Sequence, residues 1–520
     1  MKISARVKRS SYFDSITLMK IARSLTGMPG VDDAAAIMAT EPNLQLLSEA
    51  GLAPFEGVEG KVGPSDVLIV VRASDASTAE AALLAAEEQL GQRPAIGGDG
   101  DVSMQTGQRQ PRSLEQAIQL HPDASLAVIS VPGMYAALEA QRALYSGLHV
   151  FLFSDNVKVE REIALKQLAR ELDLLVMGPD CGTAMINSVG LGFVNVVPRG
   201  PIGIVGASGT GTQQVMSLIA QQGSGVSQVI GCGGRDLSEA VGAITTLQGL
   251  RLLQADEQTQ VIVLISKPPA PSVAEQVLEV AARGQKPVIV IFVGADYEAL
   301  QSRYGDRLII AHTLAEAAQQ AVSLSKTGKP TAIEQPHAIA NGGAETQYRL
   351  IALFSGGTLC DEAMHIWAEQ IGPIYSNIPL NSEWGLAQGQ RVRGHVAIDF
   401  GADEYTHGRP HPMIDPSLRL KRLQEEGCNP QVGVILLDMV LGYCSHPDPA
   451  SVYAPAIVEA LQTAAAERRP LRFVISLCGT EGDPQRLSAQ AARFREAGAE
   501  VFTSNADAAW RCVELLSLTR

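Results

Sequence analysis

Two turns in the sequence combine Gly, Ser and Thr directly after an apolar run and before a helical pattern. The first lies within IGIVGASGTGTQQVMSLI (202–219), and the second follows the apolar run that opens IALFSGGTLCDEAMHIW (351–367). Strand, tight turn and helix start in this order direct unpaired backbone amides and the positive end of a helix dipole toward one point. Such a point suits a phosphate or a carboxylate. We therefore predict anion binding, with a plain strand–helix connection as the alternative, by these residues: Gly206, Ser208, Gly209, Thr210, Ser355, Gly356, Gly357 and Thr358.

The first turn departs from three better-known glycine motifs. Its glycines run G-x-x-G-x-G, the reverse of the dinucleotide fingerprint, and no acidic residue ends the following strand to hold a ribose. The turn has no Lys, as a Walker A loop would require. Thr210 stands where the nucleophile motif G-x-S-x-G needs its second Gly. A bare cradle of amides is what remains.

Three further side chains are candidates for catalysis. Prolines stiffen the loop GRPHPMIDP (408–416), which holds Arg409 and His411, and Arg with His can bind and protonate an oxyanion. Cys181, in GPDCGTA (178–184), follows a strand beside two glycines; a small apolar filler is the alternative. No metal site is predicted, because Pro410 stiffens the segment between His407 and His411 and no third ligand is close in sequence.

Composition limits the class of protein and of partner. A chain of 520 residues is too long to fold around a single hydrophobic core, so several domains are expected. Because 46% of the residues are hydrophobic and Gly is abundant, the composition is typical of a soluble α/β protein. A formal charge of −14 argues against nucleic acid or an anionic membrane as the main partner and leaves a small anionic ligand open. The seven cysteines are odd in number and scattered along the chain, which argues against a disulfide scaffold. Without a signal-peptide pattern or a long apolar run, the chain is expected to be cytoplasmic.

Periodicity divides the chain into domains. A small α+β module is expected over residues 1–92, a linker over 93–113 and a Rossmann-like domain over 114–198. A first α/β domain follows at 199–326, a second linker at 327–346 and a second such domain at 347–520. In the parallel sheet of 114–198, ligands are expected at the strand ends 131–133, 154–156 and 178–182.

The last two domains repeat one another in sequence. GIVGASGTGTQQVMSLI is answered by IALFSGGTLCDEAMHIW, VIGCGGRDL by AIDFGADEY and VIVLISKPP by VGVILLDMVLG. KPVIVIFVG is answered by PLRFVISLCG, and AHTLAEAAQQAV by TSNADAAWRCVEL. Matching elements in the same order indicate a duplication; two unrelated units with similar turns are the alternative.

The motifs ASLAVISVPG, LLVMGPDCGTA, PIGIVGASGTGTQQ, GCGGRDL and KPVIVIFVG resemble the α subunit of succinyl-CoA synthetase, and the second half resembles the ligase domain of its β subunit. The whole chain, including GRPHPMIDPSLR, resembles the FdrA family. This resemblance implies that a CoA-binding-type domain is followed by two flavodoxin-like domains, at 199–326 and 347–520, which we call the first and second ligase-type domains. It also implies a substrate or CoA pocket bordered by Pro132, Gly178, Pro179, Cys181, Gly233 and Gly234.

The chain departs from the synthetases where they carry phosphate. Their phosphohistidine loop corresponds to ADYEALQSRYGDR (295–307), which has no His, and their steadying acid corresponds to Lys267-Pro268-Pro269. No ATP-grasp domain is recognised, so an ATP-driven relay is not supported.

The FdrA family is similar to components of oxamate carbamoyltransferase in ureide (allantoin-type) catabolism, in which phosphate cleaves oxalurate to oxamate and carbamoyl phosphate. The resemblance thus implies a carbamoyltransferase subunit that requires no cofactor, uses phosphate or carbamoyl phosphate as substrate and acts with companion subunits. It also leaves CoA binding and a homo-oligomer open. The alternatives are an NDP-forming acyl-CoA synthetase and a non-catalytic scaffold of the same fold.

Overall fold

The computed structural model describes residues 2–9, 11, 13, 15–54, 58, 62–91, 111–331, 348–387, 389–390, 392–406 and 409–518. Most of both predicted linkers, at 93–110 and 332–346, lies outside the described residues. The chain forms two compact units: Met1–Gln110 with His407–Pro410, and Pro111–Thr406 with His411–Arg520.

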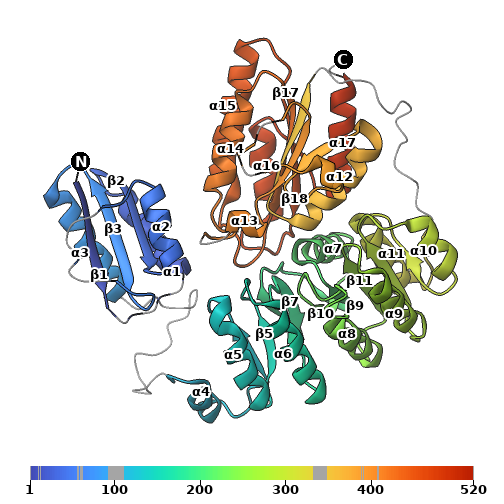
Figure 1. The fold of residues 1–520 in the computed structure, drawn as a ribbon. Coiled ribbons are helices and arrows are strands. Elements are labelled where there is room, and N and C mark those ends of the chain that lie inside the picture. The colour runs from blue at the N-terminus through green and yellow to red at the C-terminus, as the bar shows by residue number, and fades with distance from the viewer. Residues whose placement is uncertain are drawn as a thin grey trace. The chain divides into compact units, whose positions relative to one another are not determined.

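The first unit is a small α+β module, as predicted (Figure 1). Its antiparallel sheet has the order β1-β3-β2. Side chains alternate along β3: Val67, Ile69 and Val71 pack with α1 and α3, whereas Leu68 and Val70 pack with α2. Both faces of the sheet are therefore covered. The elements are β1 (Lys2–Lys8), α1 (Ser15–Thr26), β2 (Val31–Met38), α2 (Glu41–Glu49), β3 (Val67–Ala73) and α3 (Ala76–Gly91).

The second unit begins with a short parallel sheet of order β4-β5-β6. Helix α5 buries Ala136, Ala140 and Ala143, which recur at helical spacing, in the core that also holds β5 residue Val150. The elements are α4 (Leu114–Leu120), β4 (Leu126–Ile129), α5 (Gly133–Tyr145), β5 (His149–Leu152), α6 (Val159–Glu171) and β6 (Val176–Met177).

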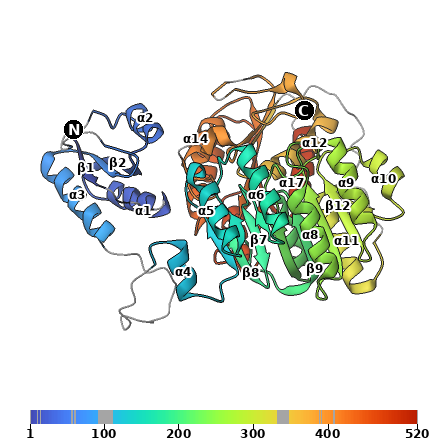
Figure 2. The ribbon, with the colours of Figure 1, turned by 60° about the horizontal axis from the view of Figure 1, so that its bottom comes forward.

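A hairpin of β7 (Thr183–Ile186) and β8 (Val189–Gly192) follows, and it belongs to the next sheet. β7 pairs antiparallel with β10, where Val229 faces Met185, and Figure 2 shows the hairpin between α6 and β9. The sequence-based boundary after residue 198 thus falls beyond a strand pair that structurally extends the following domain.

The first ligase-type domain is a doubly wound sheet of order β13-β12-β11-β9-β10-β7-β8. Its inner strand β11 is buried along its whole length, as is typical of a continuous apolar run in a parallel sheet. Helices α7 and α11 cover one face, and α8 and α9 the other (Figure 1). The elements are β9 (Arg199–Gly206), α7 (Gly209–Gln221), β10 (Val226–Gly231), α8 (Ile244–Ala255), β11 (Val261–Ser266), α9 (Pro271–Ala282), β12 (Val288–Phe292), α10 (Tyr297–Tyr304), β13 (Ile309–Ile310) and α11 (Leu314–Thr327).

The second ligase-type domain has the sheet order β15-β16-β14-β17-β18-β19. The elements are β14 (Arg349–Phe354), α12 (Gly357–Ile371), β15 (Ile374–Ser376), the 3-10 helix η1 (Ser382–Trp384), β16 (His395–Asp399), α13 (Asp403–Thr406), α14 (Ser417–Gly427), β17 (Val432–Val440), α15 (Pro449–Ala466), β18 (Arg472–Cys478), α16 (Leu487–Glu496), β19 (Glu500–Phe502) and α17 (Asn505–Leu518).

Strand order confirms the predicted duplication. In each domain we number the strands from the one that precedes the glycine turn, which is β9 in the first domain and β14 in the second. The five strands β9–β13 then lie in the flavodoxin-like order 2-1-3-4-5, and so do the five strands β14 and β16–β19. In this topology ligands bind at the carboxyl ends of strands 1 and 3, where the chain changes direction. Both glycine turns lie at such switch points. Among the described residues, no helix has both the length and the apolarity needed to cross a bilayer.

Buried polar contacts join the two ligase-type domains. The amide nitrogen Nδ2 of Asn195 donates to the Leu441 carbonyl at 2.9 Å and to the Asp483 carboxylate at 2.8 Å. The backbone N–H of Val196 donates to the same carboxylate at 2.7 Å, and Val194 forms an antiparallel bridge with Tyr443. One hydrophobic core runs through α7, α11, α12 and α17. These contacts fix the positions of the two glycine turns relative to each other.

Candidate anion site

The first helix end starts at Ser208, which caps α7. Its backbone is extended, with φ −148°, and its hydroxyl accepts the N–H of Gly211 at 3.0 Å. A Cβ on Gly206 would lie 2.1 Å from the Thr212 hydroxyl oxygen, so this position needs glycine. A Cβ on Gly209 would have no neighbour closer than 3.7 Å. As the first helical residues, Gly209 and Thr210 have amides without a carbonyl partner in their own helix.

The second helix end holds a carboxylate of the protein itself. Asp438, in β17, accepts the Ser355 N–H at 2.8 Å, the Ser355 hydroxyl at 2.9 Å and the Gly356 N–H at 2.9 Å. Its charge is balanced by Arg419, whose Nη2 lies 3.0 Å from Oδ1. Two of the predicted phosphate donors are therefore engaged internally. The amides of Gly357 and Thr358, which open α12, remain at the helix end.

The two helix ends meet, as the sequence predicts. The Ser208 hydroxyl donates to the Thr358 hydroxyl at 2.7 Å. A Cβ on Gly211 would lie 3.1 Å from Cγ2 of Thr358, and one on Gly356 would lie 2.6 Å from the Thr210 hydroxyl oxygen. The positive poles of α7 and α12, each worth about half a unit charge, converge on this contact. We call Gly209–Thr210 and Gly357–Thr358, with these two hydroxyls, the facing helix ends.

Charged side chains that sequence reasoning did not select border the facing helix ends. Lys267 follows β11, and its Nζ lies 3.4 Å from Asp361 Oδ2 in α12. Asp399, the last residue of β16, is 6% exposed, and a Cβ on Gly357 would lie 2.7 Å from its Oδ2. Burial raises the pKa of Asp399 to about 6, opposed by the Gly401 amide and Lys267. Lys267 follows strand 3 of the first ligase-type domain, and Asp399 ends strand 2 of the second, so both lie at the carboxyl edge of a sheet, where ligands are expected.

His411 lies close to the second helix end. The point where a Cβ on Gly401 would stand is 2.7 Å from the Ser355 carbonyl oxygen, 3.0 Å from His411 Nε2 and 3.1 Å from Asp399 Oδ1. Burial, with Arg419 nearby, lowers the pKa of His411 to about 4, so its imidazole is neutral at pH 7. The Met413 N–H donates to Nδ1 at 3.3 Å, which leaves the hydrogen on Nε2.

The other two catalytic candidates are placed differently. Cys181 is 2% exposed, and burial raises the pKa of its thiol to about 12, which favours packing over nucleophilic attack at neutral pH. Arg409 is exposed and belongs to the first compact unit, whereas His411 belongs to the second. The role of Arg409 in binding a substrate carboxylate stays a prediction. His407 lies outside the described residues.

The strand ends predicted to border a substrate or CoA pocket lie together. Gly133, which follows Pro132 at the start of α5, packs so tightly on the next strand end that a Cβ would lie 2.1 Å from the Asp155 carbonyl oxygen. A Cβ on Gly233, whose φ is +82°, would lie 2.3 Å from the Pro179 carbonyl oxygen. Gly178 also has a positive φ, +112°, whereas the space beside Gly234 is open.

Asp180 is a titratable group at these strand ends that the sequence did not single out. Its N–H donates to the Ser154 carbonyl at 3.0 Å, which joins two of the strand ends. The surrounding protein, with Asp155 and Asp403 nearby, raises the pKa of Asp180 to about 7. Asp180 is itself exposed to solvent, which weakens this effect.

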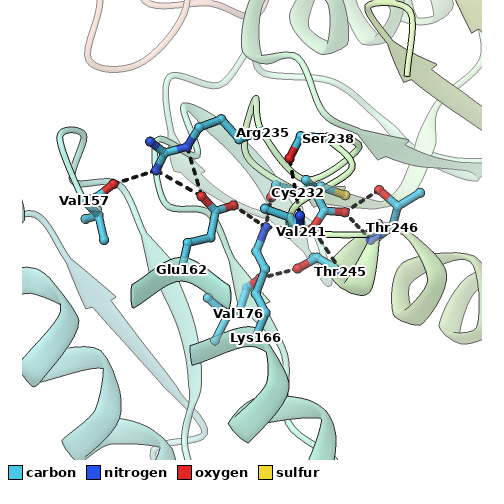
Figure 3. A network of polar contacts seen from close by, with 11 residues as sticks. Val157, Glu162, Lys166, Val176, Cys232, Arg235, Ser238, Val241, Thr245 and Thr246 are labelled. Carbon is cyan, nitrogen blue, oxygen red and sulfur yellow. Dashed lines mark hydrogen bonds and ion pairs between the residues drawn. The ribbon is translucent and has the colours of Figure 1, made fainter. Parts of the chain in front are cut away.

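A buried ionic network fixes the strand ends to the first ligase-type domain (Figure 3). Lys166, in α6, has no exposed side-chain surface, and its Nζ donates to Glu162 at 2.8 Å, to Asp236 at 2.7 Å and to the Cys232 carbonyl at 3.0 Å. Arg235 donates to the second Glu162 oxygen at 3.0 Å. The turn GCGGRD, which carries Gly233 and Gly234, is therefore anchored to α6.

Three family models match parts of the chain. The model described as CoA-ligase matches residues 353–512, and the CoA binding domain model matches 199–294, within the first ligase-type domain. The model described as AllF, heavy metal-associated domain, matches residues 1–105. Residues 1–105 contain neither Cys nor His. In the described part of the chain, no group of three or more His, Cys, Asp or Glu side chains is arranged to hold a metal ion.

The chain is similar to several known proteins. It is 42% identical over 519 residues to the uncharacterized protein YahF of Escherichia coli (strain K12), which covers 97% of each chain. It is 26% identical over 188 residues to subunit alpha 1 of succinate–CoA ligase [ADP-forming] of Archaeoglobus fulgidus, covering 35% of this chain and 62% of that subunit.

A solved structure, the dinucleotide-forming acetyl-coenzyme A synthetase 1 of Ca. Korarchaeum cryptofilum, matches with 17% identity and a TM-score of 0.33 over 76% of this chain and 83% of that one. The α/β fold carries CoA-binding-type and CoA-ligase-type domains, which relate it to acyl-CoA chemistry. With YahF matching along nearly its full length, the chain belongs to the succinyl-CoA synthetase-like FdrA/AllF-type family.

Proposed function

We propose that the chain is a carbamoyl-transfer subunit that uses inorganic phosphate to cleave oxalurate into oxamate and carbamoyl phosphate. The observation that carries this proposal is the contact of the facing helix ends, in which Ser208 and Thr358 lie 2.7 Å apart. Two converging helix dipoles stabilise an anion electrostatically and need no covalent carrier. The lack of His in residues 295–307 agrees with direct phosphate chemistry.

In this proposal the facing helix ends hold the phosphate. Amides of Gly209, Thr210, Gly357 and Thr358 donate to its oxygens, and Lys267 contributes a nearby positive charge. A phosphate oxygen forms a bond to the carbamoyl carbon, and negative charge moves to the carbonyl oxygen. His411, neutral and with its hydrogen on Nε2, is suited to donate to that oxygen.

Acyl-CoA ligation is the second candidate, because the matched models are described as CoA-ligase and CoA binding domain. The strand ends around Gly178, Pro179 and Gly233, with the open space beside Gly234, would then hold CoA or its acyl group. Companion subunits are part of either proposal, since the succinate–CoA ligase relatives are themselves named as subunits.

The two candidates are separated by one assay and one titration. The chain, purified alone and together with proteins encoded beside its gene, is incubated with oxalurate and phosphate, and carbamoyl phosphate release is measured. CoA and phosphate are titrated calorimetrically in parallel. Phosphate binding with carbamoyl phosphate release supports the first candidate, whereas CoA binding without either result supports the second. Gly209→Val, which crowds the first helix end, should weaken phosphate binding; unchanged affinity would contradict the proposed site.

A further inference from the structure

We propose that Asp399 is the proton-transferring residue at the facing helix ends. It takes up a proton when a tetrahedral dianion occupies the site and gives that proton to the leaving nitrogen. The inference deepens the proposed function and rests on it.

The position of the carboxylate is the first argument. Asp399 ends β16, is 6% exposed and has one oxygen, Oδ1, held by the Gly401 N–H at 2.9 Å. The other oxygen, Oδ2, accepts no hydrogen bond from the described part of the chain. It is directed at the start of α12, since it lies 2.7 Å from the point where a Cβ on Gly357 would stand. The carboxylate oxygen Oδ2 therefore borders the helix end at which the proposed anion is bound.

The charges around Asp399 are the second argument. Arg419, from α14, is paired with Asp438 of β17 at 3.0 Å, and Lys267 is 3.4 Å from Asp361 of α12. Each nearby cation thus has another carboxylate as its close partner. His411, on the loop before α14, is neutral at pH 7 because burial lowers its pKa to about 4. Asp399 has no ion pair of its own among the described residues, and burial raises its pKa to about 6 although the Gly401 amide and the charge of Lys267 lower it. A dianion beside it raises the pKa further.

The chemical step balances with a single proton. With Asp399 protonated, an oxygen of hydrogen phosphate forms a bond to the carbamoyl carbon of oxalurate. The bond from that carbon to the oxamate nitrogen breaks, and its electron pair stays on nitrogen, which takes the proton from Asp399. The proton of the attacking hydrogen phosphate then passes to Asp399, which restores the acid. The products are oxamate and carbamoyl phosphate.

The test separates proton uptake from binding. Sulfate, which stays a dianion throughout, is titrated calorimetrically into the wild-type chain from about pH 5 to about pH 8, in buffers of different ionisation enthalpy. We expect sulfate affinity to fall by up to about tenfold per pH unit above pH 6, with about one proton taken up per sulfate bound near pH 7. In Asp399→Asn, both the pH slope and the proton uptake should disappear. Glu404→Gln, an exposed acid on α13, is the matched control and should keep both.

The possible outcomes distinguish failure of the proposed function from failure of the role of Asp399. Sulfate and phosphate failing to bind at every pH would overturn the proposed function and this inference together. Sulfate binding with the same pH slope in wild type and Asp399→Asn would overturn the inference alone. Melting curves at each pH establish that Asp399→Asn is folded; should it be unfolded, Asp399→Ser, which keeps an acceptor for the Gly401 N–H, replaces it in the same comparison.

Discussion

The hydroxyl of Ser208 donates to the hydroxyl of Thr358 at 2.7 Å, although 150 positions separate them in the chain. Both residues stand at the starts of helices that follow the first strand of a doubly wound sheet. Ser208 also accepts the Gly211 N–H, so one side chain both caps its own helix and joins it to the other. A hydrogen bond between the two ligase-type domains is therefore part of the candidate anion site.

Removing either hydroxyl should reveal this coupling. Ser208→Ala should lower the free energy of unfolding by about 1 to 2 kcal/mol, since a cap and a hydrogen bond are both lost. Thr358→Val should cost about 1 kcal/mol. The double variant should cost less than the sum, because each single change already breaks the shared bond. Denaturant unfolding of the three variants measures the coupling, and strict additivity would mean that the hydroxyls do not interact in solution.

Two glycines in the first turn should differ in how much stability they lose on substitution by Ala. Gly206→Ala places a methyl group 2.1 Å from the Thr212 hydroxyl oxygen and should destabilise the fold by about 2 kcal/mol or more. Gly209→Ala meets its nearest atom at 3.7 Å and should change stability by less than about 1 kcal/mol. Thermal unfolding compares the two. Phosphate should still protect Gly209→Ala more than it protects Gly209→Val, whose branched side chain crowds the amides.

The buried network around Lys166 should be sensitive to loss of its cation. Lys166→Met leaves Glu162 and Asp236 without their shared partner and should cost about 3 to 5 kcal/mol. Arg235→Ala, at a side chain that is 47% exposed, should cost about 1 kcal/mol or less. Chemical denaturation gives both values. If both variants lost the same free energy of unfolding, burial would not determine how much each side chain contributes to stability.

Asp399 should give stability a distinctive pH dependence. Its pKa in the folded chain, about 6, exceeds the value near 4 of an unfolded Asp, so the folded chain binds this proton more tightly. Stability contributed by that proton is present at low pH and is lost as pH rises from about 4 to about 6. Asp399→Asn carries no such loss, so its stability relative to wild type should rise by about 2 to 3 kcal/mol across this range. A pH-independent difference in melting would contradict the assignment.

The chain should not be phosphorylated by ATP on the route used by the synthetases. Residues 295–307 contain no His, and the next one, His312, is stacked on Tyr297 with ring centroids 4.6 Å apart. Incubation with γ-labelled ATP should therefore leave the chain unlabelled, whereas a succinate–CoA ligase alpha subunit serves as the positive control. Acid-labile, base-stable label on His312, or on His365 of α12, would restore a phosphohistidine mechanism.

The duplicated fold was predictable because its signals are local. Fully buried parallel strands appear as unbroken apolar runs, and glycine-rich turns end them, so element order followed from the sequence. Sequence patterns place residues 183–192 in the preceding domain, because nothing in that segment identifies β10 as the partner that β7 meets through Met185 and Val229. Sheet membership is a non-local property.

The backbone amides of the anion site could be predicted from the sequence, whereas the pairing of its charged side chains could not. Gly and Ser at a strand–helix turn indicate an amide cradle wherever they occur. A lone Asp438 within the apolar run LLDMV also signals that a buried carboxylate must be paired. Its partners Ser355, Gly356 and Arg419 come from other elements, and their identity requires the three-dimensional arrangement.

The two ligase-type domains belong to one polypeptide, so their stoichiometry is fixed at one to one, and the Val194–Tyr443 bridge and the Asn195–Asp483 hydrogen bond hold them together. Dilution cannot separate the facing helix ends, because each is held near the other at a high effective concentration set by the chain itself. Anion affinity and unfolding midpoint should therefore be independent of protein concentration with respect to this contact. Any concentration dependence that is observed would report on a partner at another surface.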